Sequence, residues 1–590
     1  MTIRVVSKHG VAALVAAAFV LPLSSAGAAP GGLKGLTRVS EDKIVDGVGL
    51  HHSVVQPSLA ADGTKKTLVG AFEVGRIFNG GSSAIGWTTS PDGGNGWNDG
   101  LLPLTVAGKQ ATTAAGPLWR AADPSVAPDE QDKTWLIAST GLNGTGGSVG
   151  LFVNSSKDGH KWSAPVVAHA AAAGDAPQNG SLACDNWPSS KGYGNCYVAY
   201  NNTASTPANL LQVVTSTDGG ATWSAPGSTA DASTGTSAVA LVQPPPPGAA
   251  PGAECGRVVV LYTGVPVSGV NSVNWFASSD CGATWSAHVQ ILPNTTLTHT
   301  VAQNLRTGLV VSGSTDGAGA IYLAWQTRNY RFSTTTLAAA AAAGATNIKV
   351  ASTTGMFTGG TLVVDSGSGS AETVTATTVG GAGASGTGVT ISPALALPHA
   401  SGATVTVNAP TNAGNDLALS VLPAPTDAAP APSFGAPARV AIEADTSASN
   451  TVDHFIPAIA ADPNSSGSSA RLALFYYFYP LAACQYVNNP TNQCSPQAGY
   501  VSSTDGGATW SAPQSLSPGP PSLAVYPRTL ALGGTGNGGP DLGNVLAAAV
   551  VPAGPHRGDA FGLFPVAVPV NGIDEAMYVP RHGLEIGGGS

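Results

Sequence analysis

The chain has 590 residues, a formal net charge of −9 at pH 7 and only 10% charged residues, against about 25% in a typical globular protein. A chain this poor in lysine and arginine lacks the basic surface that nucleic-acid binding requires, so we expect no nucleic-acid partner. Its length is enough for a large core and for more than one domain.

The first 28 residues are typical of a secretory signal peptide. Arg4 and Lys8 supply a basic start, an apolar run follows at 11–23, and Ala26-Gly27-Ala28 matches a small-residue cleavage site. The apolar run is shorter than the roughly 20 residues that span a bilayer. We therefore expect residues 1–28 to be a signal peptide, and the remaining chain to be secreted into the extracellular space without a membrane span.

One short motif occurs five times and follows the pattern Ser-x-Asp-x-Gly-x-x-Trp or close to it. Residues 216–226 return letter for letter at 503–513, and looser copies occupy 90–97, 156–162 and 278–285. Asp bonds its own backbone in turns, Gly accepts a positive φ, and Trp is a large apolar anchor. Each copy therefore predicts a tight turn between two strands, and the repetition indicates a repeat architecture.

The motif resembles the Asp-box of sialidases and related β-propellers. Five copies make the resemblance specific for the fold. The box says little about activity, because in that family it lies on the rim, away from the catalytic face. The aspartates of the first four copies are 60 to 66 residues apart, further than the roughly 40–50 residues of compact propeller repeats. This spacing fits four strands and long loops in each blade.

Strand signals between the boxes predict the number of blades. The inner strands are expected at 57–62, 123–127, 181–184, 237–242, 308–311, 457–462 and 529–532. The second strands are expected at 67–72, 134–138, 196–200, 258–262, 320–325, 472–477 and 545–550. Seven inner strands predict seven blades, and six, the number in sialidases, is the alternative. The expected fold is an all-β, sialidase-like β-propeller of six or seven four-stranded blades with a small inserted β module.

The last two boxes are too far apart for the repeat, because Asp280 and Asp505 are separated by 225 residues. Within this interval an alanine run at 338–343 could form a short helical turn or a linker. Strand signals follow it at 347–351, 360–365, 372–378 and 388–391. We expect a small β-rich module at 335–407 on the front of the fifth blade, where it could partly cover the central mouth. It divides the propeller into segments 38–334 and 408–581.

The six cysteines pair by neighbourhood. Cys184 with Cys196, Cys255 with Cys281 and Cys484 with Cys494 are the expected disulfides, which export permits. No CxxC or HExxH spacing occurs, so we expect no metal site and no cofactor.

Antiparallel strand order divides the loops of a blade between two faces. The boxes join the third and fourth strands, so they lie on a back face with the turns between first and second strands. The opposite front face carries the residues before each inner strand and those between the second and third strands. Before inner strands lie His51, His52, Arg120, Asp123, Arg306, Asp453, His454, Tyr526 and Arg528. Between second and third strands lie Glu73, Arg76, Gln326, Arg328, Tyr330, Arg331, Tyr477, Tyr479, His556, Arg557 and Asp559.

The front face is rich in arginine. Seven of the twelve arginines that follow residue 28 are expected there, a notable grouping in a chain so poor in charge. Arginines in one mouth suit a carboxylate or a similar anion through bidentate pairing. We therefore expect a glycan or another extracellular anionic ligand.

The resemblance to sialidases implies specific roles on this face. That family holds the substrate carboxylate with three arginines and uses a tyrosine activated by a glutamate as nucleophile, with an aspartate as acid/base. By position, Arg120, Arg306 and Arg528 would form the arginine triad, with Arg328 and Arg76 as further substrate-binding residues. Tyr477 would be the nucleophile, Glu73 its base and Asp123 the acid. The family's Arg-Ile-Pro element is absent, and Arg76-Ile77-Phe78 resembles it only superficially.

A structural role is the alternative for two of these residues. Asp123 would then cap the turn before Pro124, and Tyr477 would belong to a strand wall. Three functions follow: a glycoside hydrolase of the exo-α-sialidase type, a noncatalytic propeller that serves as an extracellular binding or adhesion module, and a structural exoprotein whose inserted module binds. We expect a monomer in each case.

Overall fold

The computed structural model describes residues 35–587 with gaps. The gaps are 45–48, 64, 78–79, 105–110, 114–115, 266–270, 292–300, 302–306, 308, 328–332, 354–355, 357, 359–360, 366–367, 381–385, 408–413, 427–431, 443–451, 480–495, 517–527, 530–539, 544 and 570–572. The expected signal peptide at 1–28 and the expected Cys484–Cys494 disulfide lie outside the described residues.

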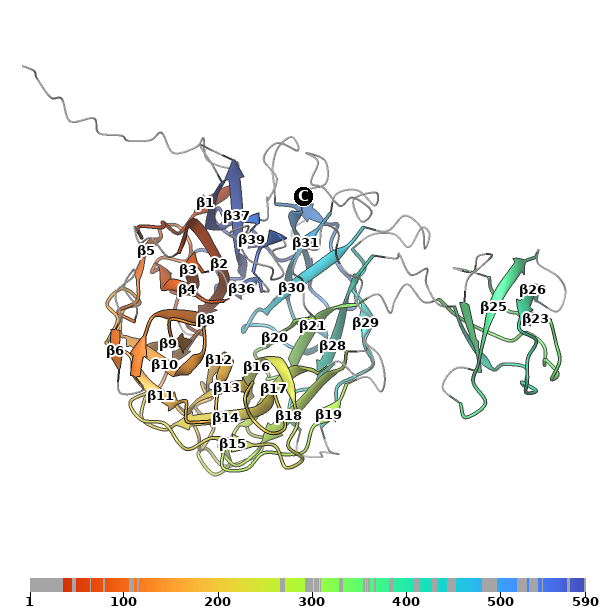
Figure 1. The fold of residues 1–590 in the computed structure, drawn as a ribbon, viewed down its shortest axis with the longest axis horizontal. Coiled ribbons are helices and arrows are strands. Elements are labelled where there is room, and N and C mark those ends of the chain that lie inside the picture. Colours follow the sequence, from red (N-terminus) through yellow and green to blue (C-terminus); the bar gives the residue numbers. More distant parts are fainter. Residues whose placement is uncertain are drawn as a thin grey trace, which may run out of the picture.

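Antiparallel sheets of four strands are arranged in a ring (Figure 1). From the inside outward, blade 1 is β2 (Leu50–Ala61), β3 (Leu68–Arg76), β4 (Ser82–Ser90) and β5 (Asn98–Leu101). Blade 2 is β8 (Arg120–Asp129), β9 (Thr134–Leu142), β10 (Ser148–Ser156) and β11 (Val166–Ala170). Blade 3 is β12 (Pro177–Cys184), β13 (Cys196–Asn202), β14 (Leu210–Ser216) and β15 (Gly227–Ser228). Blade 4 is β16 (Gly235–Gln243), β17 (Arg257–Gly264), β18 (Val273–Ser278) and β19 (Val289–Gln290).

Three further blades complete the ring. Blade 5 is β20 (Val311–Thr315), β21 (Ile321–Thr327), β28 (Asp416–Leu422) and β29 (Ala438–Arg439). Blade 6 is β30 (His454–Ala461), β31 (Leu472–Phe478), β32 (Gln497–Ser503) and β33 (Gln514–Ser515). Blade 7 is β36 (Ala547–Val550), β37 (Asp559–Pro569), β38 (Ile573–Pro580) and β1 (Leu36–Arg38), and β39 (Leu584–Glu585) also pairs with β37.

The ring is closed, and it has seven blades. Each inner strand contacts the inner strand of the next blade, in the order β2, β8, β12, β16, β20, β30 and β36, and β36 contacts β2 again. Blade 7 is completed by the first strand of the chain, since Leu36 of β1 pairs with Pro580 of β38. The fold is therefore the expected all-β, sialidase-like β-propeller, and seven is the correct one of the two blade numbers.

The hydrophobic core is divided among the seven blade interfaces. One cluster of buried side chains lies between each pair of neighbouring blades. The five box tryptophans belong to these interfaces. Trp97 of blade 1, for example, meets Phe561 of blade 7 with ring centroids 6.0 Å apart, and Trp285 packs in the cluster between blades 3 and 4. The indoles therefore join neighbouring blades and do not line the central mouth.

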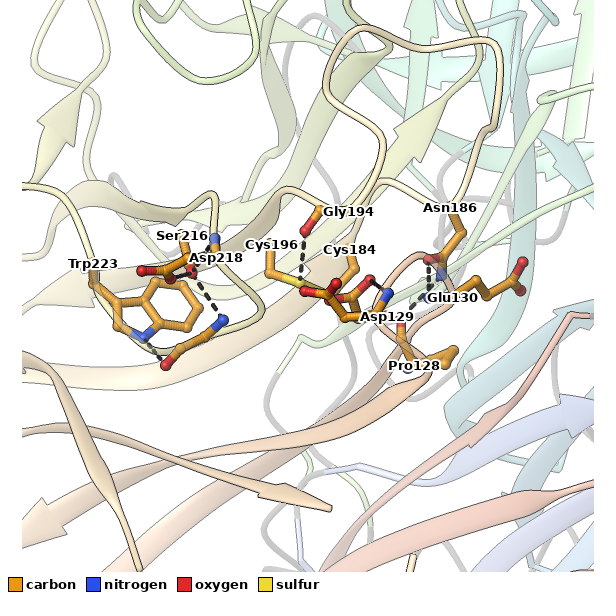
Figure 2. The surroundings of a disulfide bond; sticks show 12 residues. Pro128, Asp129, Glu130, Cys184, Asn186, Gly194, Cys196, Ser216, Asp218 and Trp223 are labelled. Atoms are coloured by element: carbon orange, nitrogen blue, oxygen red, sulfur yellow. Dashed lines mark hydrogen bonds between the residues drawn. A yellow bond between two sulfur atoms is a disulfide. The ribbon is translucent and has the colours of Figure 1, made fainter. Parts of the chain in front are cut away.

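Each box is a turn between the third and fourth strands, and its contacts explain its sequence (Figure 2). In blade 3 the Ser216 hydroxyl donates to Asp218 Oδ1 at 2.8 Å, and the same oxygen accepts the Thr222 N–H at 2.8 Å. The Gly220 N–H donates to Ser216 Oγ at 2.9 Å, and Trp223 Nε1 donates to the Gly220 carbonyl at 3.1 Å. Gly220 has a φ of 85°, which only glycine adopts without strain.

The described part of the chain contains two disulfides, and both were predicted. Cys184 and Cys196 face each other across β12 and β13 with a Cα–Cα distance of 4.0 Å. Cys196 pairs with Ser216 of the box, so the disulfide and the box lie at the same end of blade 3 (Figure 2). Cys255 precedes β17, and its disulfide with Cys281, at a Cα–Cα distance of 5.3 Å, ties that loop to the box of blade 4.

A separate sheet lies in the chain between β21 and β28, which pair with each other in blade 5. Its strands are β22 (Ser333–Thr336), β23 (Asn347–Val350), β24 (Thr361–Val364), β25 (Glu372–Val379), β26 (Thr387–Ser392) and β27 (Thr404–Val407). They enclose their own hydrophobic cluster. The alanine run forms no helical turn, and Ala341 instead bridges to His399. Figure 1 shows this sheet beside the ring and not over its centre.

The assignment of blade 7 from sequence was wrong by one strand. Residues 545–550 were expected to form its second strand, but β36 at Ala547–Val550 is the inner strand. Strand β34 (Arg528–Thr529) pairs only with β35 (Pro540–Asp541). His556, Arg557 and Asp559 therefore follow the first strand and lie on the back face, where His556 Nε2 meets Asn95 Oδ1 of the first box at 3.1 Å. The inner strand of blade 5 also begins three residues later than expected, at Val311.

Candidate functional site

A repeated bulge shapes the central mouth, which is the front end of the inner strands. In five inner strands one residue with a positive φ interrupts the pairing with the second strand. These residues are Gln56 (56°), Asp123 (51°), Asn179 (53°), Ser237 (54°) and Ile456 (50°). A bulge leaves its N–H outside the ladder of its own blade, so this donor is available to a side chain of the preceding blade.

Asp123 and Glu73 are both bound within this system. The Asp123 N–H donates to Glu73 Oε1 of blade 1 at 3.1 Å. Asp123 Oδ2 in turn accepts the Asn179 N–H of blade 3 at 3.1 Å and the Thr140 hydroxyl at 3.3 Å. The two carboxylates therefore connect blades 1, 2 and 3 in series.

The same connection exists elsewhere in the ring with a neutral acceptor. In blades 5 and 6, the N–H of the bulge residue Ile456 donates to Gln326 Oε1 at 2.9 Å. Gln326 occupies the second strand of its blade, as Glu73 does in blade 1. An amide oxygen thus does the work of the Glu73 carboxylate, which indicates that this bond needs an acceptor and no charge.

Tyr477 lies at the position of blade 6 that Glu73 has in blade 1. Tyr477 pairs with Phe455, the residue just before the bulge residue Ile456. Glu73 likewise pairs with Val55, the residue just before the bulge residue Gln56. The Tyr477 side chain is fully buried between blades 6 and 7, and its hydroxyl donates to the Pro565 carbonyl at 3.1 Å. Burial, and then the negative charge of Glu575, raises the pKa of Tyr477 well above its usual value, so the phenol stays protonated at neutral pH.

Arg76 forms a buried ion pair that the sequence did not reveal. Its Nη1 lies 3.5 Å from Glu575 Oε2, and the two side chains are 4% and 0% exposed. Ser53 Oγ donates to the same carboxylate oxygen at 2.9 Å. Glu575 was missed because no strand was predicted over β38, although a glutamate at the start of a third strand is a front-face residue by the rule used for the other blades.

Arg120 lies at the start of β8 beside Trp119. The guanidinium donates to the Gly80 carbonyl at 3.2 Å and to the Gly144 carbonyl at 2.6 Å, and burial lowers the pKa of Arg120. The Trp119 ring packs over Gly144, where a Cβ would lie 3.8 Å away, and 44% of Trp119 remains exposed. An exposed indole and a guanidinium thus stand side by side on the front face.

The expected arginine triad stays a prediction, because Arg120 is its only member whose side chain the structure describes. Arg306 and Arg328 lie outside the described residues, and only the backbone of Arg528 is described, in β34. Two other arginines of this face bind carboxylates of the protein itself. Arg38 Nη1 lies 2.6 Å from Asp574 Oδ2, and Arg439 Nε lies 3.0 Å from Asp416 Oδ2.

A polar pocket of about 280 Å³ opens beside blade 4 on the front face. The blade-4 pocket, as we call it, is lined by Asp231, Ala232, Ser233, Thr234, Tyr262, Gly264, Val265, Ser272, Asn274, His288 and Gln290. It was not foreseen, because its lining combines the connection at 231–234 with strands of blade 4, and no motif marks these residues. Within the described part of the chain, no three His, Cys, Asp or Glu side chains are placed to hold a metal ion. No helix there is long and apolar enough to cross a bilayer.

No protein-family model matches the chain, and no curated protein matches it. Solved structures similar to it include a protein of unknown function from Dyadobacter fermentans, at 14% identity and a TM-score of 0.37, covering 80% of this chain and 99% of that one. The intramolecular trans-sialidase from Ruminococcus gnavus matches at 12% identity and a TM-score of 0.37, covering 72% and 90%. The leech intramolecular trans-sialidase matches at 13% identity and a TM-score of 0.36, covering 75% and 67%.

Proposed function

We propose that this protein is a secreted β-propeller that binds glycans on its front face without hydrolysing them. The observation that carries this proposal is the engagement of all three candidate catalytic side chains within the propeller. Glu73 and Asp123 accept backbone N–H groups of the following blades, and the Tyr477 hydroxyl donates to a core carbonyl. Glycoside hydrolysis needs a nucleophile and an acid on either side of the scissile bond, and these groups already have other partners.

Binding is supported by the side chains that the front face does expose. Trp119 presents 44% of its surface next to the Arg120 guanidinium. An indole buries a large area at little entropic cost, and the apolar face of a sugar ring stacks well on it. The two disulfides agree with an oxidising, extracellular environment, and secretion and a monomeric state belong to the same proposal.

A second candidate is hydrolysis of the exo-α-sialidase type. One observation favours it: Tyr477 is close enough to Glu575 for the charge of Glu575 to raise the pKa of the phenol, and Glu575 contacts Arg76. Tyrosine, glutamate and arginine are the residue types that the resemblance to sialidases implies. In this arrangement Glu575, and not Glu73, would be the base, and Tyr477 would first have to leave Pro565.

The two candidates are separated by one pair of measurements on the secreted protein. A panel of immobilised glycans, acidic and neutral, measures binding, and fluorogenic glycosides including a sialoside measure turnover. We expect saturable binding without release of the fluorophore. Trp119→Ala should weaken binding at least tenfold at an unchanged melting temperature, and Trp119→Phe should restore most of it.

Release of the fluorophore that disappears in Tyr477→Phe would replace this proposal by the hydrolase. Absence of both binding and turnover over the whole panel would remove both candidates.

A further inference from the structure

Blades 3 and 4 repeat the same strand pattern, which makes their residues comparable one by one. Their bulge residues are Asn179 and Ser237. In the second strands, Tyr200 pairs with Gln212 of β14, and Tyr262 pairs with Asn274 of β18. Two residues further along, Asn202 of blade 3 corresponds to Gly264 of blade 4.

In blade 3 the Asn202 side chain links the third strand to the segment that leads into the inner strand. Its Nδ2 donates to Gln212 Oε1 at 3.2 Å and to Asp175 Oδ1 at 2.6 Å. Its Oδ1 accepts the Ala176 N–H at 2.9 Å. The acceptor at the Gln212 position is therefore satisfied by a neighbour from the adjacent strand.

In blade 4 the corresponding acceptor has no hydrogen-bond partner within the described part of the chain. Gly264 has no side chain, and polar atoms occupy the place of its first carbon: Ser272 Oγ would lie 2.3 Å and Asn274 Nδ2 2.8 Å from an added Cβ. Asn274 Nδ2 donates to Ser272 Oγ at 2.8 Å, but Asn274 Oδ1 has no hydrogen-bond partner among the described residues. Asn274 is only 3% exposed, and a buried acceptor without a donor costs free energy.

The other blades show that the polar surroundings of Gly264 are a property of blade 4. The counterparts of Gly264 are Val74 in blade 1, Gly141 in blade 2, Thr327 in blade 5 and Phe478 in blade 6. Only blade 2 also has a glycine, and there the apolar Phe152 ring lies 2.2 Å from an added Cβ, where blade 4 has the polar Ser272 Oγ at 2.3 Å. Blade 4 alone among these combines a missing side chain with a polar lining.

Charge limits what the pocket can hold. Asp231 is the only Asp, Glu, Lys or Arg among the lining residues. Burial alone would raise the pKa of its carboxyl, but hydrogen bonds from the side chains of Ser233 and His288 lower it to about 2. The ionised Asp231 repels an anion. The hydrogen bonds from Ser233 and His288 already stabilise its negative charge, so Asp231 attracts a cation only weakly.

We infer that the blade-4 pocket is a subsite for one neutral pyranose ring of a bound glycan. This rests on the proposed function of the front face. A volume of about 280 Å³ is near the lower end of the roughly 300–1,000 Å³ of ligand pockets, which suits one ring and no longer segment. A sugar hydroxyl supplies the donor that Asn274 Oδ1 lacks. Val265, 40% exposed, offers an apolar wall, and His288 and Gln290 offer polar contacts at the rim.

The test uses the full chain and small probes. Methyl glycosides of glucose, galactose and mannose are titrated by ligand-observed NMR, with methyl sialoside as an anionic probe and choline as a cationic one. We expect saturable binding of at least one neutral glycoside and none of the charged probes at this pocket. The double variant Gly264→Asn/Ser272→Leu copies Asn202 and Leu210 of blade 3 and should weaken this binding at least tenfold.

Gln290→Ala and Ser228→Ala form a matched pair that needs no change in the core. Both residues are exposed and pair with corresponding residues, Asn274 and Gln212, in the two blades. Gln290→Ala should weaken binding about threefold or more, and Ser228→Ala should leave it unchanged. If the double variant does not fold, this pair of variants tests whether the blade-4 pocket binds the sugar.

The outcomes separate this inference from the proposed function. Glycan binding that survives both Gln290→Ala and a folded double variant overturns the subsite and leaves front-face binding intact. Binding of only the sialoside or only choline overturns the neutral ligand class. Failure of every glycan to bind the unaltered protein overturns both.

Discussion

Arg38 and Asp574 are 536 residues apart in the sequence, yet Arg38 Nη1 lies 2.6 Å from Asp574 Oδ2. The pair belongs to the seam at which β1 completes blade 7. Leu36 of the same strand is buried in the cluster between blades 6 and 7.

Closure should depend more on Leu36 than on the ion pair. Leu36→Ala should lower the free energy of unfolding by about 2–5 kcal/mol, because it leaves a cavity in the core. Arg38→Ala should cost about 1 kcal/mol or less, since both partners of its ion pair are partly exposed, at 31% and 21%. Urea unfolding measures both. A larger loss for Arg38→Ala would mean that charge, and not packing, holds the seam.

The box tryptophans should differ in their contribution to stability. Trp285 is 6% exposed and meets the Phe276 ring at 5.6 Å, whereas Trp223 is only half-buried. Trp285→Ala should destabilise by about 3–5 kcal/mol, and Trp223→Ala by less. Chemical denaturation of both variants, with Trp→Phe at each position as control, gives the order. Equal losses of unfolding free energy would show that the turn geometry, and not the burial of the indole, determines the contribution of each tryptophan.

Glu73 can be tested against the amide that replaces it in blade 5. Glu73→Gln keeps an acceptor for the Asp123 N–H, as Gln326 does for Ile456, and should change stability little. Glu73→Ala leaves the buried N–H without that acceptor and should cost about 1–3 kcal/mol. Thermal melting compares the two. If Glu73→Gln abolished an activity while leaving the melting temperature unchanged, the glutamate would be a catalytic base after all.

Glu130 should make stability depend on pH. Burial, and next the negative charge of Asp62, raises the pKa of the Glu130 carboxyl. The folded state therefore binds this proton more tightly than the unfolded state, and stability is lost as pH rises through the raised pKa. Glu130→Gln keeps an oxygen for the Gly63 N–H, which Glu130 Oε1 accepts at 2.8 Å, and removes the charge.

The Glu130→Gln variant should accordingly melt at a higher temperature than the unaltered protein at pH 7, with a smaller difference at pH 4. Figure 2 shows Glu130 next to Asn186, whose Oδ1 accepts the Glu130 N–H at 2.9 Å. The backbone N–H at position 130 keeps this bond whether the residue is glutamate or glutamine, so the comparison isolates the effect of the carboxylate charge. A difference that grew toward pH 4 would reverse the sign and contradict the assignment.

Residues 335–407 are proposed to fold as a unit of their own. Strands β22–β27 share a hydrophobic cluster that contains no propeller residue, and β21 pairs directly with β28. Deleting 335–407 and joining the ends should leave a soluble ring with its far-UV spectrum of strands and a cooperative melt. Loss of all soluble protein would show that the sheet is needed by blade 5.

The repeated parts of the fold were predictable from sequence, and the seam was not. Box turns, inner strands and two disulfides follow local patterns that recur in the chain, as Asp218 and Cys184 illustrate. Blade 7 has no box, and its outer strand comes from residues 36–38 at the other end of the chain. The sequence patterns therefore predicted β36 as a second strand, and Glu575 was not among the predicted site residues.

The candidate site was less predictable, because it depends on contacts between blades. The assumed strand order predicted arginines on one face, but it did not predict the buried Glu575 beside Arg76. The blade-4 pocket is lined by Gly264 and by the buried Asn274, and neither residue belongs to a motif. An alignment of 196–202 with 257–264 on Tyr200 and Tyr262 is the signal that could have shown it.

The place of β1 in the last blade sets an order of events during synthesis. β1 is made before every other described strand, but its partner β38 ends only at Pro580. At about 5–20 residues per second, the strand waits on the order of half a minute to two minutes for its partner. A nascent chain that is interrupted before β38 has no partner strand for β1. The ring can therefore close only after translation has passed β38.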